Sequence, residues 1–167
     1  DVAETLEETG AEILLVPNGS PYFRGKMEVR QNMMVARVVE TGLPLVYLNM
    51  VGGQDDQVFD GGSFVLNPHG GLAVQLPVFD SCVAHVDFER GDDGWRAVAG
   101  DLAHQPDAME QDYRVMVESL RDYCAKTGFG KVLLGLSGGI DSAIVATIAA
   151  DALGADNVRC VMLPSEY

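Results

Sequence analysis

A short glycine-rich segment between an apolar strand and an apolar helix limits most strongly what this chain can fold into. Val132 to Leu136 is a continuous apolar run typical of a buried strand. Ala143 to Leu153 is an alanine-rich helix that ends at Gly154. From the end of this strand to the start of the helix the chain reads Gly135-Leu-Ser-Gly-Gly-Ile-Asp-Ser142. Consecutive glycines let a backbone approach a ligand closely, and the free N–H groups of a helix start favour an anion. The segment therefore predicts an anion site.

Two other classes of site share part of this pattern. A nucleophile elbow, G-x-S-x-G, needs an acid and then a histidine further along the chain, but His69, His85 and His104 all lie upstream. The mononucleotide P-loop needs a lysine after its glycines, whereas Lys131 precedes the strand, which excludes that class. A purely structural glycine turn, with Asp141 only capping the helix, remains an alternative.

The first half of the chain alternates between strands and helices. We expect a short acidic helix from Asp1 to Thr9, a buried strand Ile13–Val16 that Pro17 ends, and a helix from Lys26 to Thr41. A second buried strand follows at Leu45 to Leu48. Antiparallel hairpins are then expected where glycine pairs separate short apolar runs. These runs are Val58-Phe59, Ser63 to Leu66, Leu72 to Leu76 and a closing strand, Val83 to Phe88.

The second half predicts a parallel sheet. The stretch from Glu89 to Asp107 is polar and is the candidate linker. A helix then opens at Asp107 with capping-box spacing and ends at Gly128. The strand, glycine segment and helix described above follow, and then a strand from Val158 to Leu163. This order is typical of a doubly wound parallel sheet. We expect domains at residues 1–90 and 107–167, with 91–106 as linker.

Composition restricts the partners. The net charge is −14, and between Val38 and Tyr113 the only basic residues are Arg90 and Arg96. Such a surface repels phosphate backbones and anionic lipids, so we expect neither a nucleic-acid nor a membrane partner. No apolar run approaches the ~20 residues of a membrane span.

The three cysteines are too scattered for a disulfide framework or a zinc site. This cysteine usage predicts a reducing compartment, the cytoplasm. The chain begins without Met, and we expect it to be an internal piece of a longer protein.

The glycine segment resembles the SGGxDS pyrophosphate loop of the N-type ATP pyrophosphatases, without a mismatch. The resemblance implies that Asp141 binds Mg²⁺, which prefers hard oxygen ligands, and that the loop holds the pyrophosphate of ATP. The ATP-binding residues it implies are Gly135, Leu136, Ser137, Gly138, Gly139, Ile140, Asp141 and Ser142.

The flanking sequences resemble one family with this loop, the glutamine-dependent NAD synthetases. In the second half the resemblance rests on Tyr113-Arg-Val-Met-Val-Glu and Asp156-Asn-Val-Arg-Cys-Val-Met-Leu-Pro. In the first half it rests on Gly10-Ala-Glu-Ile-Leu-Leu-Val-Pro-Asn-Gly-Ser-Pro-Tyr and Val51-Gly-Gly-Gln-Asp-Asp. The implied fold is α/β. It is a partial nitrilase-like α-β-β-α layer followed by the start of a doubly wound ATP pyrophosphatase domain.

The resemblance also implies a reaction. Glutamine hydrolysis supplies ammonia, ATP adenylates deamido-NAD⁺, and ammonia displaces AMP to give NAD⁺. The implied ligands are therefore ATP, Mg²⁺, glutamine and deamido-NAD⁺, and we expect a homo-oligomer. Two alternatives stay open: another amidotransferase or adenylating enzyme with the same loop, and a non-catalytic nucleotide-binding scaffold.

Only some of the functional residues of the family's first domain have counterparts in this chain. Ser20 and Lys26 match glutamine-contacting positions of the family. Its Glu-Lys-Cys triad is expected upstream of this chain, so we expect the fragment alone to be inactive and to contain no catalytic residue.

Cys82 is expected to be a buried cysteine in the strand near residue 83, and His85 a core or edge residue of that strand. The remaining acidic cluster, Asp55, Asp56 and Asp60, is expected to be a solvated hairpin face.

Overall fold

The computed structural model describes residues 2–162 and divides the chain into two compact units. Unit 1 consists of Asp1–Val51 and Phe59–Pro106, and unit 2 consists of Gly52–Val58 and Asp107–Tyr167. The fold is mixed α/β in both units, as the sequence predicts. The predicted domain limits at residues 90 and 106 stay predictions. None of the helices within residues 2–162 combines the length and the apolar composition that crossing a bilayer requires.

Unit 1 is built on a four-stranded sheet in the order β1-β2-β5-β6. Strands β1 (Leu14–Asn18) and β2 (Leu45–Asn49) run parallel, with Leu14 opposite Leu45. Strands β5 (Phe64–Leu66) and β6 (Leu72–Gln75) continue the sheet antiparallel. Strand β1 runs on through Pro17, where the sequence predicted its end. It is an edge strand, and a proline at an edge removes no hydrogen bond that the sheet needs.

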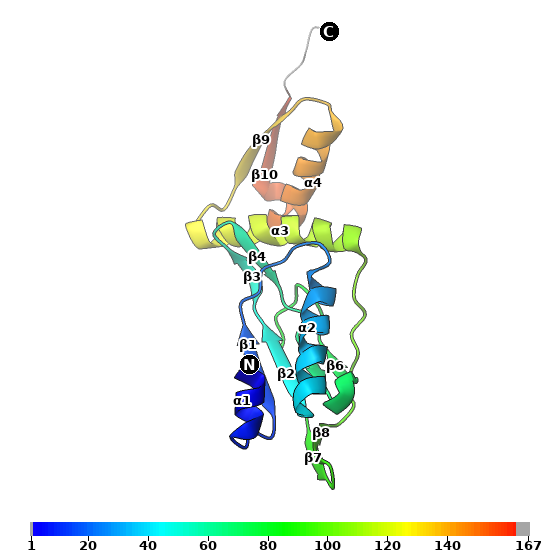
Figure 1. The fold of residues 1–167 in the computed structure, drawn as a ribbon. Helices are drawn as coiled ribbons and strands as arrows, with labels where there is room; N and C mark the ends of the chain where they lie inside the picture. Colours follow the sequence, from blue (N-terminus) through cyan, green and yellow to red (C-terminus); the bar gives the residue numbers. More distant parts are fainter. Residues whose placement is uncertain (1, 163–167) are drawn as a thin grey trace. The chain divides into compact units, whose positions relative to one another are not determined.

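Helix α2 (Lys26–Thr41) connects the parallel strands and covers one face of the sheet (Figure 1). It ends as predicted at Gly42, whose φ of 67° is the left-handed conformation typical of a helix C-terminus. Its apolar stripe packs against alternate residues of the strands, because side chains of a strand alternate between its faces. The buried members of this core are Leu14, Val38, Leu45, Tyr47, Phe64 and Leu66. Helix α1 (Val2–Glu8) and the 3₁₀ turn Pro68–Gly70 complete this side.

The opposite face carries a second, smaller core around Val65, Ala73, Val74 and Ala97. Part of it comes from a hairpin of β7 (Phe88–Gly91) and β8 (Gly94–Ala97), most of which lies in the polar stretch that the sequence analysis took as a candidate linker.

The predicted strand from Val83 to Phe88 does not form. Residues 81–87 have no regular structure, and Val83 is 91% exposed. The free edge of β6 is already occupied, since Gln75 N–H donates to Asp101 O and Ala103 N–H donates to Gln75 O. An apolar run without a strand edge to pair with stays irregular. The expectations for two residues of this run are therefore wrong: Cys82 is exposed rather than buried, and His85 lies exposed outside any strand.

Unit 2 contains a parallel pair of strands with two helices. Strand β9 (Val132–Leu136) pairs with β10 (Val158–Met162), Val132 lying opposite Val158. Leu163, the predicted end of β10, lies outside the described residues. Helix α4 (Ile140–Leu153) connects the two strands, and the 3₁₀ turn Ala155–Asn157 leads into β10. Both strands expose more apolar surface than predicted, Leu133 being 69% exposed.

Helix α3 (Ala108–Thr127) packs against α4. It begins as predicted at Asp107, whose side chain accepts hydrogen bonds from the N–H groups of Met109 and Glu110, each at 2.9 Å. Val117, Ile148 and Ala152 form the buried contact between the helices. Beside it, Tyr113 Oη donates to Asp151 Oδ2 at 2.5 Å.

A hairpin tip also packs on α3. It belongs to strands β3 (Val51–Gln54) and β4 (Gln57–Asp60). Gly53 N–H donates to Asp122 Oδ2 at 2.7 Å, and Lys126 Nζ donates to Gly53 O. A Cβ at position 53 would lie 3.1 Å from Asp122 Cβ. A glycine therefore allows the tip to reach this helix.

We predict that Tyr113 is the alkali-sensitive link between α3 and α4. The hydrogen bond to Asp151, with the negative charge of that carboxylate, raises the pKa of Tyr113 above its ordinary value of 10.0. A raised folded-state pKa contributes stability below pH 10, and this contribution is lost as the pH rises through the raised value. A pH titration of the full-length protein, followed by tyrosinate absorbance, should show an ionisation step above the ordinary tyrosine pKa. Tyr113→Phe should remove this step, and Tyr123→Phe should not. A titration unchanged by Tyr113→Phe would contradict the assignment.

Candidate functional site

The glycine-rich segment forms a compact turn between β9 and α4. Residues 137–139 lie between the two elements, and Gly138 has a φ of 85°, which side chains other than glycine rarely adopt. Ser142 Oγ donates to Gly139 O at 2.9 Å, and Ser137 Oγ lies 3.2 Å from Ser142 Oγ. Gly139 N–H also points at Ser137 Oγ, at 3.4 Å. The two serines thus converge across the turn.

The amino end of α4 is open to solvent. Gly139, at the cap position, has an extended backbone and offers no side-chain cap. The N–H groups of the first helical residues have no acceptor within the helix. Residues 137–141 are all exposed, and Ser142 is half-buried. Backbone donors, two hydroxyls and the helix dipole therefore face the same open space, an arrangement that suits a polyanion.

Asp141 lies in the first turn of α4 with an exposed carboxylate. Within the described part of the chain, Asp141 takes part in no ion pair or side-chain hydrogen bond, so both of its oxygens are open. The described residues also contain no group of three or more His, Cys, Asp or Glu side chains that could hold a metal ion. A cation at Asp141 would accordingly need ligand oxygens from a second molecule, which is how Mg²⁺ usually binds with phosphates.

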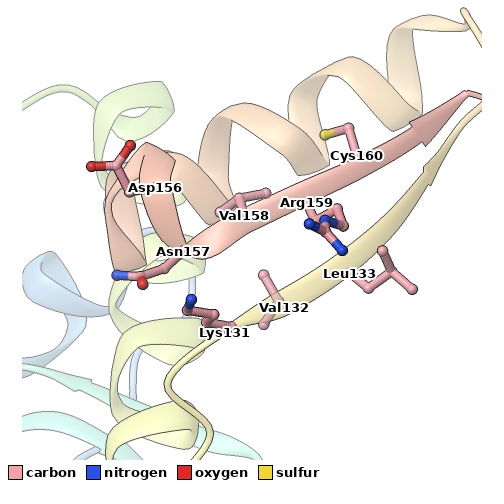
Figure 2. A pocket seen from close by; sticks show the side chains of 8 residues that line it. All are labelled: Lys131, Val132, Leu133, Asp156, Asn157, Val158, Arg159 and Cys160. Carbon is pink, nitrogen blue, oxygen red and sulfur yellow. The ribbon is translucent and has the colours of Figure 1, made fainter.

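Unit 2 also contains an open groove away from the glycine turn. It has a volume of about 680 Å³ and lies along the amino-terminal parts of β9 and β10, and Figure 2 shows Lys131, Asn157 and Arg159 along it. The glycine turn contributes no residue to its lining. In open α/β sheets ligands bind at the carboxyl ends of the strands. We therefore place the candidate site at the turn after Leu136 and not in this groove.

In unit 1, Ser20 lies in the turn after β1 and is held by its backbone. Its N–H donates to Asn49 Oδ1 at 2.8 Å, and Asn49 Nδ2 donates to Ser20 O at 3.2 Å. Asn49, at the end of the neighbouring parallel strand β2, is 5% exposed. The carboxyl ends of the two parallel strands therefore form this turn together.

The structure reveals roles for Arg30 and Asp60 that the sequence analysis missed. Arg30, on the inner face of α2, donates from Nε to Ser20 Oγ at 3.1 Å and from Nη2 to Ser20 O at 2.7 Å. Its guanidinium also forms a bidentate pair with Asp60, at 2.9 and 2.7 Å. The expectation that Asp60 lies on a solvated face is wrong, since Asp60 is 1% exposed, while Asp55 and Asp56 are exposed as expected. The sequence did offer one indication: Arg30 is a charged residue on the otherwise apolar stripe of α2, and such a residue needs a buried partner of opposite charge.

Lys26 does not join Ser20. It is the first residue of α2, and its Nζ lies 4.5 Å from the centre of the Phe23 ring. No hydrogen bond connects Lys26 with Ser20 among the described residues. The turn thus places Ser20 firmly, whereas Lys26 contacts a neighbouring aromatic ring.

Two family models match the chain in sequence. The model described as carbon-nitrogen hydrolase matches residues 2–93, and the model described as NAD synthase matches residues 112–167. The first covers unit 1 up to the β7–β8 hairpin and includes the hairpin tip that packs on α3. The second begins within α3 and includes the glycine turn.

Named relatives agree with these matches. The glutamine-dependent NAD(+) synthetase of Rhodobacter capsulatus is 66% identical over all of this chain, which covers 30% of that protein. That of Acinetobacter baylyi is 41% identical, with the same coverage. A solved structure of the synthetase from Acinetobacter baumannii, in complex with adenosine diphosphate, superposes with a TM-score of 0.90 at 39% identity. It is matched over 98% of this chain and 31% of its own length. The predicted resemblance is confirmed, and the chain spans about 30% of the length of these relatives.

Proposed function

The chain belongs to the carbon-nitrogen hydrolase family through residues 2–93, and on this premise we propose that it is part of a glutamine-dependent NAD⁺ synthetase. The full protein would hydrolyse glutamine to release ammonia and use that ammonia to amidate deamido-NAD⁺. The order of the two family matches supports this proposal, because the ammonia-releasing region precedes the ammonia-consuming region in one chain.

The glycine turn at the start of α4 is the observation that carries the nucleotide half of the proposal. In the proposed reaction a carboxylate oxygen of deamido-NAD⁺ attacks the α-phosphorus of ATP, and pyrophosphate leaves. Ammonia then attacks the acyl carbon, and AMP leaves. The exposed N–H groups of α4 and the hydroxyls of Ser137 and Ser142 are suited to hold the pyrophosphate oxygens. The solved relative from Acinetobacter baumannii binds an adenine nucleotide, adenosine diphosphate, which supports a nucleotide ligand.

The open carboxylate of Asp141 fits a Mg²⁺ ion that accompanies ATP. When bound, this ion would neutralise charge on the phosphates. The contribution of the chain itself is to hold Asp141 in the first helical turn, next to the backbone donors. We also propose that the other residues of the glycine segment named above contact ATP. We further propose that the protein is cytoplasmic, forms a homo-oligomer, and binds small molecules rather than nucleic acids or membranes.

The glutamine half of the proposal rests on Ser20. Its backbone is fixed by Asn49 and Arg30, as a substrate-contacting residue should be. Lys26 is the second proposed glutamine contact, and it would have to leave the Phe23 ring to serve as one.

Asp141→Asn in the full-length protein should lower ATP-dependent NAD⁺ synthesis at least about a hundredfold with either glutamine or ammonium. The reason is that charge stabilisation by a metal ion is worth several kcal/mol. Glutamine hydrolysis should persist. Asp156→Asn, at an exposed carboxylate elsewhere in unit 2, is the matched control and should keep synthesis near the parent rate. Synthesis retained in Asp141→Asn would contradict the metal-binding role.

Gly138→Ala should weaken ATP binding about five- to thirtyfold, because a left-handed conformation costs a side chain about 1–2 kcal/mol and the binding-competent turn becomes rarer. Gly128→Ala imposes the same strain at a φ of 81°, at the end of α3. Both positions have open space around a new Cβ. A comparison of the two variants therefore distinguishes the effect of backbone strain alone from an effect on the glycine turn. Calorimetric titration of the two full-length variants with ATP measures the difference. Equal weakening would argue against a nucleotide site at Gly138.

Ser20→Ala should raise KM for glutamine about tenfold, the effect of losing one hydrogen bond to a charged or strongly polar group. The rate with ammonium should stay within about twofold of the parent, because ammonium bypasses glutamine hydrolysis. Ser81→Ala, an exposed serine of the same unit, is the control. If both nitrogen sources lose activity to the same extent, Ser20 has only a structural role.

A further inference from the structure

The Ser20 hydroxyl has a defined direction because its neighbour can only donate. Arg30 Nε–H donates to Ser20 Oγ at 3.1 Å, and a guanidinium has five N–H donors and no acceptor. The Ser20 proton must therefore point away from Arg30. Among the described residues, the Ser20 hydroxyl has no acceptor of its own within hydrogen-bond distance. The proton is thus open to an acceptor that is not part of these residues.

Arg30 itself is not available to a ligand. It is 3% exposed, and its charge is matched by the bidentate contact with Asp60. Its Nη2 also donates to Ser20 O and, at 3.2 Å, to Pro21 O. A substrate carboxylate would have to displace a buried aspartate to reach this guanidinium, which would leave a buried charge unpaired.

We infer that Arg30, held by Asp60, is a positioning residue that fixes Ser20 as a hydrogen-bond donor to an oxygen of the glutamine substrate. The inference rests on the proposed function. It also specifies the chemistry of the contact: Ser20 takes a carboxylate or amide carbonyl oxygen and not the α-ammonium group, which has no lone pair to accept the proton. Because the rotamer is set before binding, less side-chain entropy is lost when substrate arrives.

A double-mutant cycle in the full-length protein tests this inference. Arg30→Lys keeps the charge but loses the planar fork that reaches Asp60 and Ser20 together. We expect it to raise KM for glutamine about tenfold, with kcat and the ammonium-dependent rate within about twofold of the parent. In the Ser20→Ala background the same change should add less than about twofold, because Arg30 acts through the hydroxyl that is already gone.

Additive effects of Arg30→Lys and Ser20→Ala on KM would overturn the inference, since a merely structural arginine acts whether or not the hydroxyl is present. If Arg30→Lys fails to fold, the neutral pair Arg30→Gln with Asp60→Asn replaces it, because removing both buried charges is tolerated better than removing one. The same non-additivity with Ser20→Ala is then expected. A parent protein that makes NAD⁺ from ammonium but never from glutamine would instead reject the proposed glutamine half.

Discussion

The buried ion pair between Arg30 and Asp60 is the interaction on which the organisation of unit 1 depends. Removing two charges from water costs several kcal/mol per ion, and only close, bidentate geometry with further hydrogen bonds offsets that cost. Here the guanidinium makes both contacts with Asp60 and also donates from Nε and Nη2 to the turn after β1. The pair thus ties helix α2, the end of β4 and the turn that contains Ser20. Exchanging one partner for an apolar residue would leave the other charge buried alone.

The glycine turn of unit 2 differs from the Ser20 turn because its polar groups are exposed and not paired with buried charges. Its backbone donors are left exposed, and the amino end of α4 has no side-chain cap among the described residues. An exposed helix start with two converging hydroxyls and an open carboxylate contributes little to stability. It is suited to hold a bound polyanion with its cation. Unit 1 positions its polar turn by burying charge, whereas unit 2 keeps its polar turn open.

Much of the local structure could be predicted from the sequence because local signals determine it. Helix α2 has the bounds predicted for it, and helix α3 begins at its Asp107 cap. The failures concern partners that are distant in the chain. The run from Val83 to Val86 has strand composition, but residues 100–103 already occupy the free edge of β6. Asp60 is acidic and close to exposed Asp55 and Asp56, yet its environment is set by Arg30, thirty residues earlier.

Sequence patterns were enough to predict the SGGxDS turn with its helix and the family resemblance. Each of these depends on residue type and spacing within a short window. Which polar side chains meet depends on the three-dimensional fold. It placed Arg30 between Asp60 and Ser20, brought Asn49 to the Ser20 backbone, and kept Lys26 apart from them. The physical reason is that a buried charge takes its partner from whatever the fold brings within hydrogen-bond distance, and spacing along the chain does not show that partner.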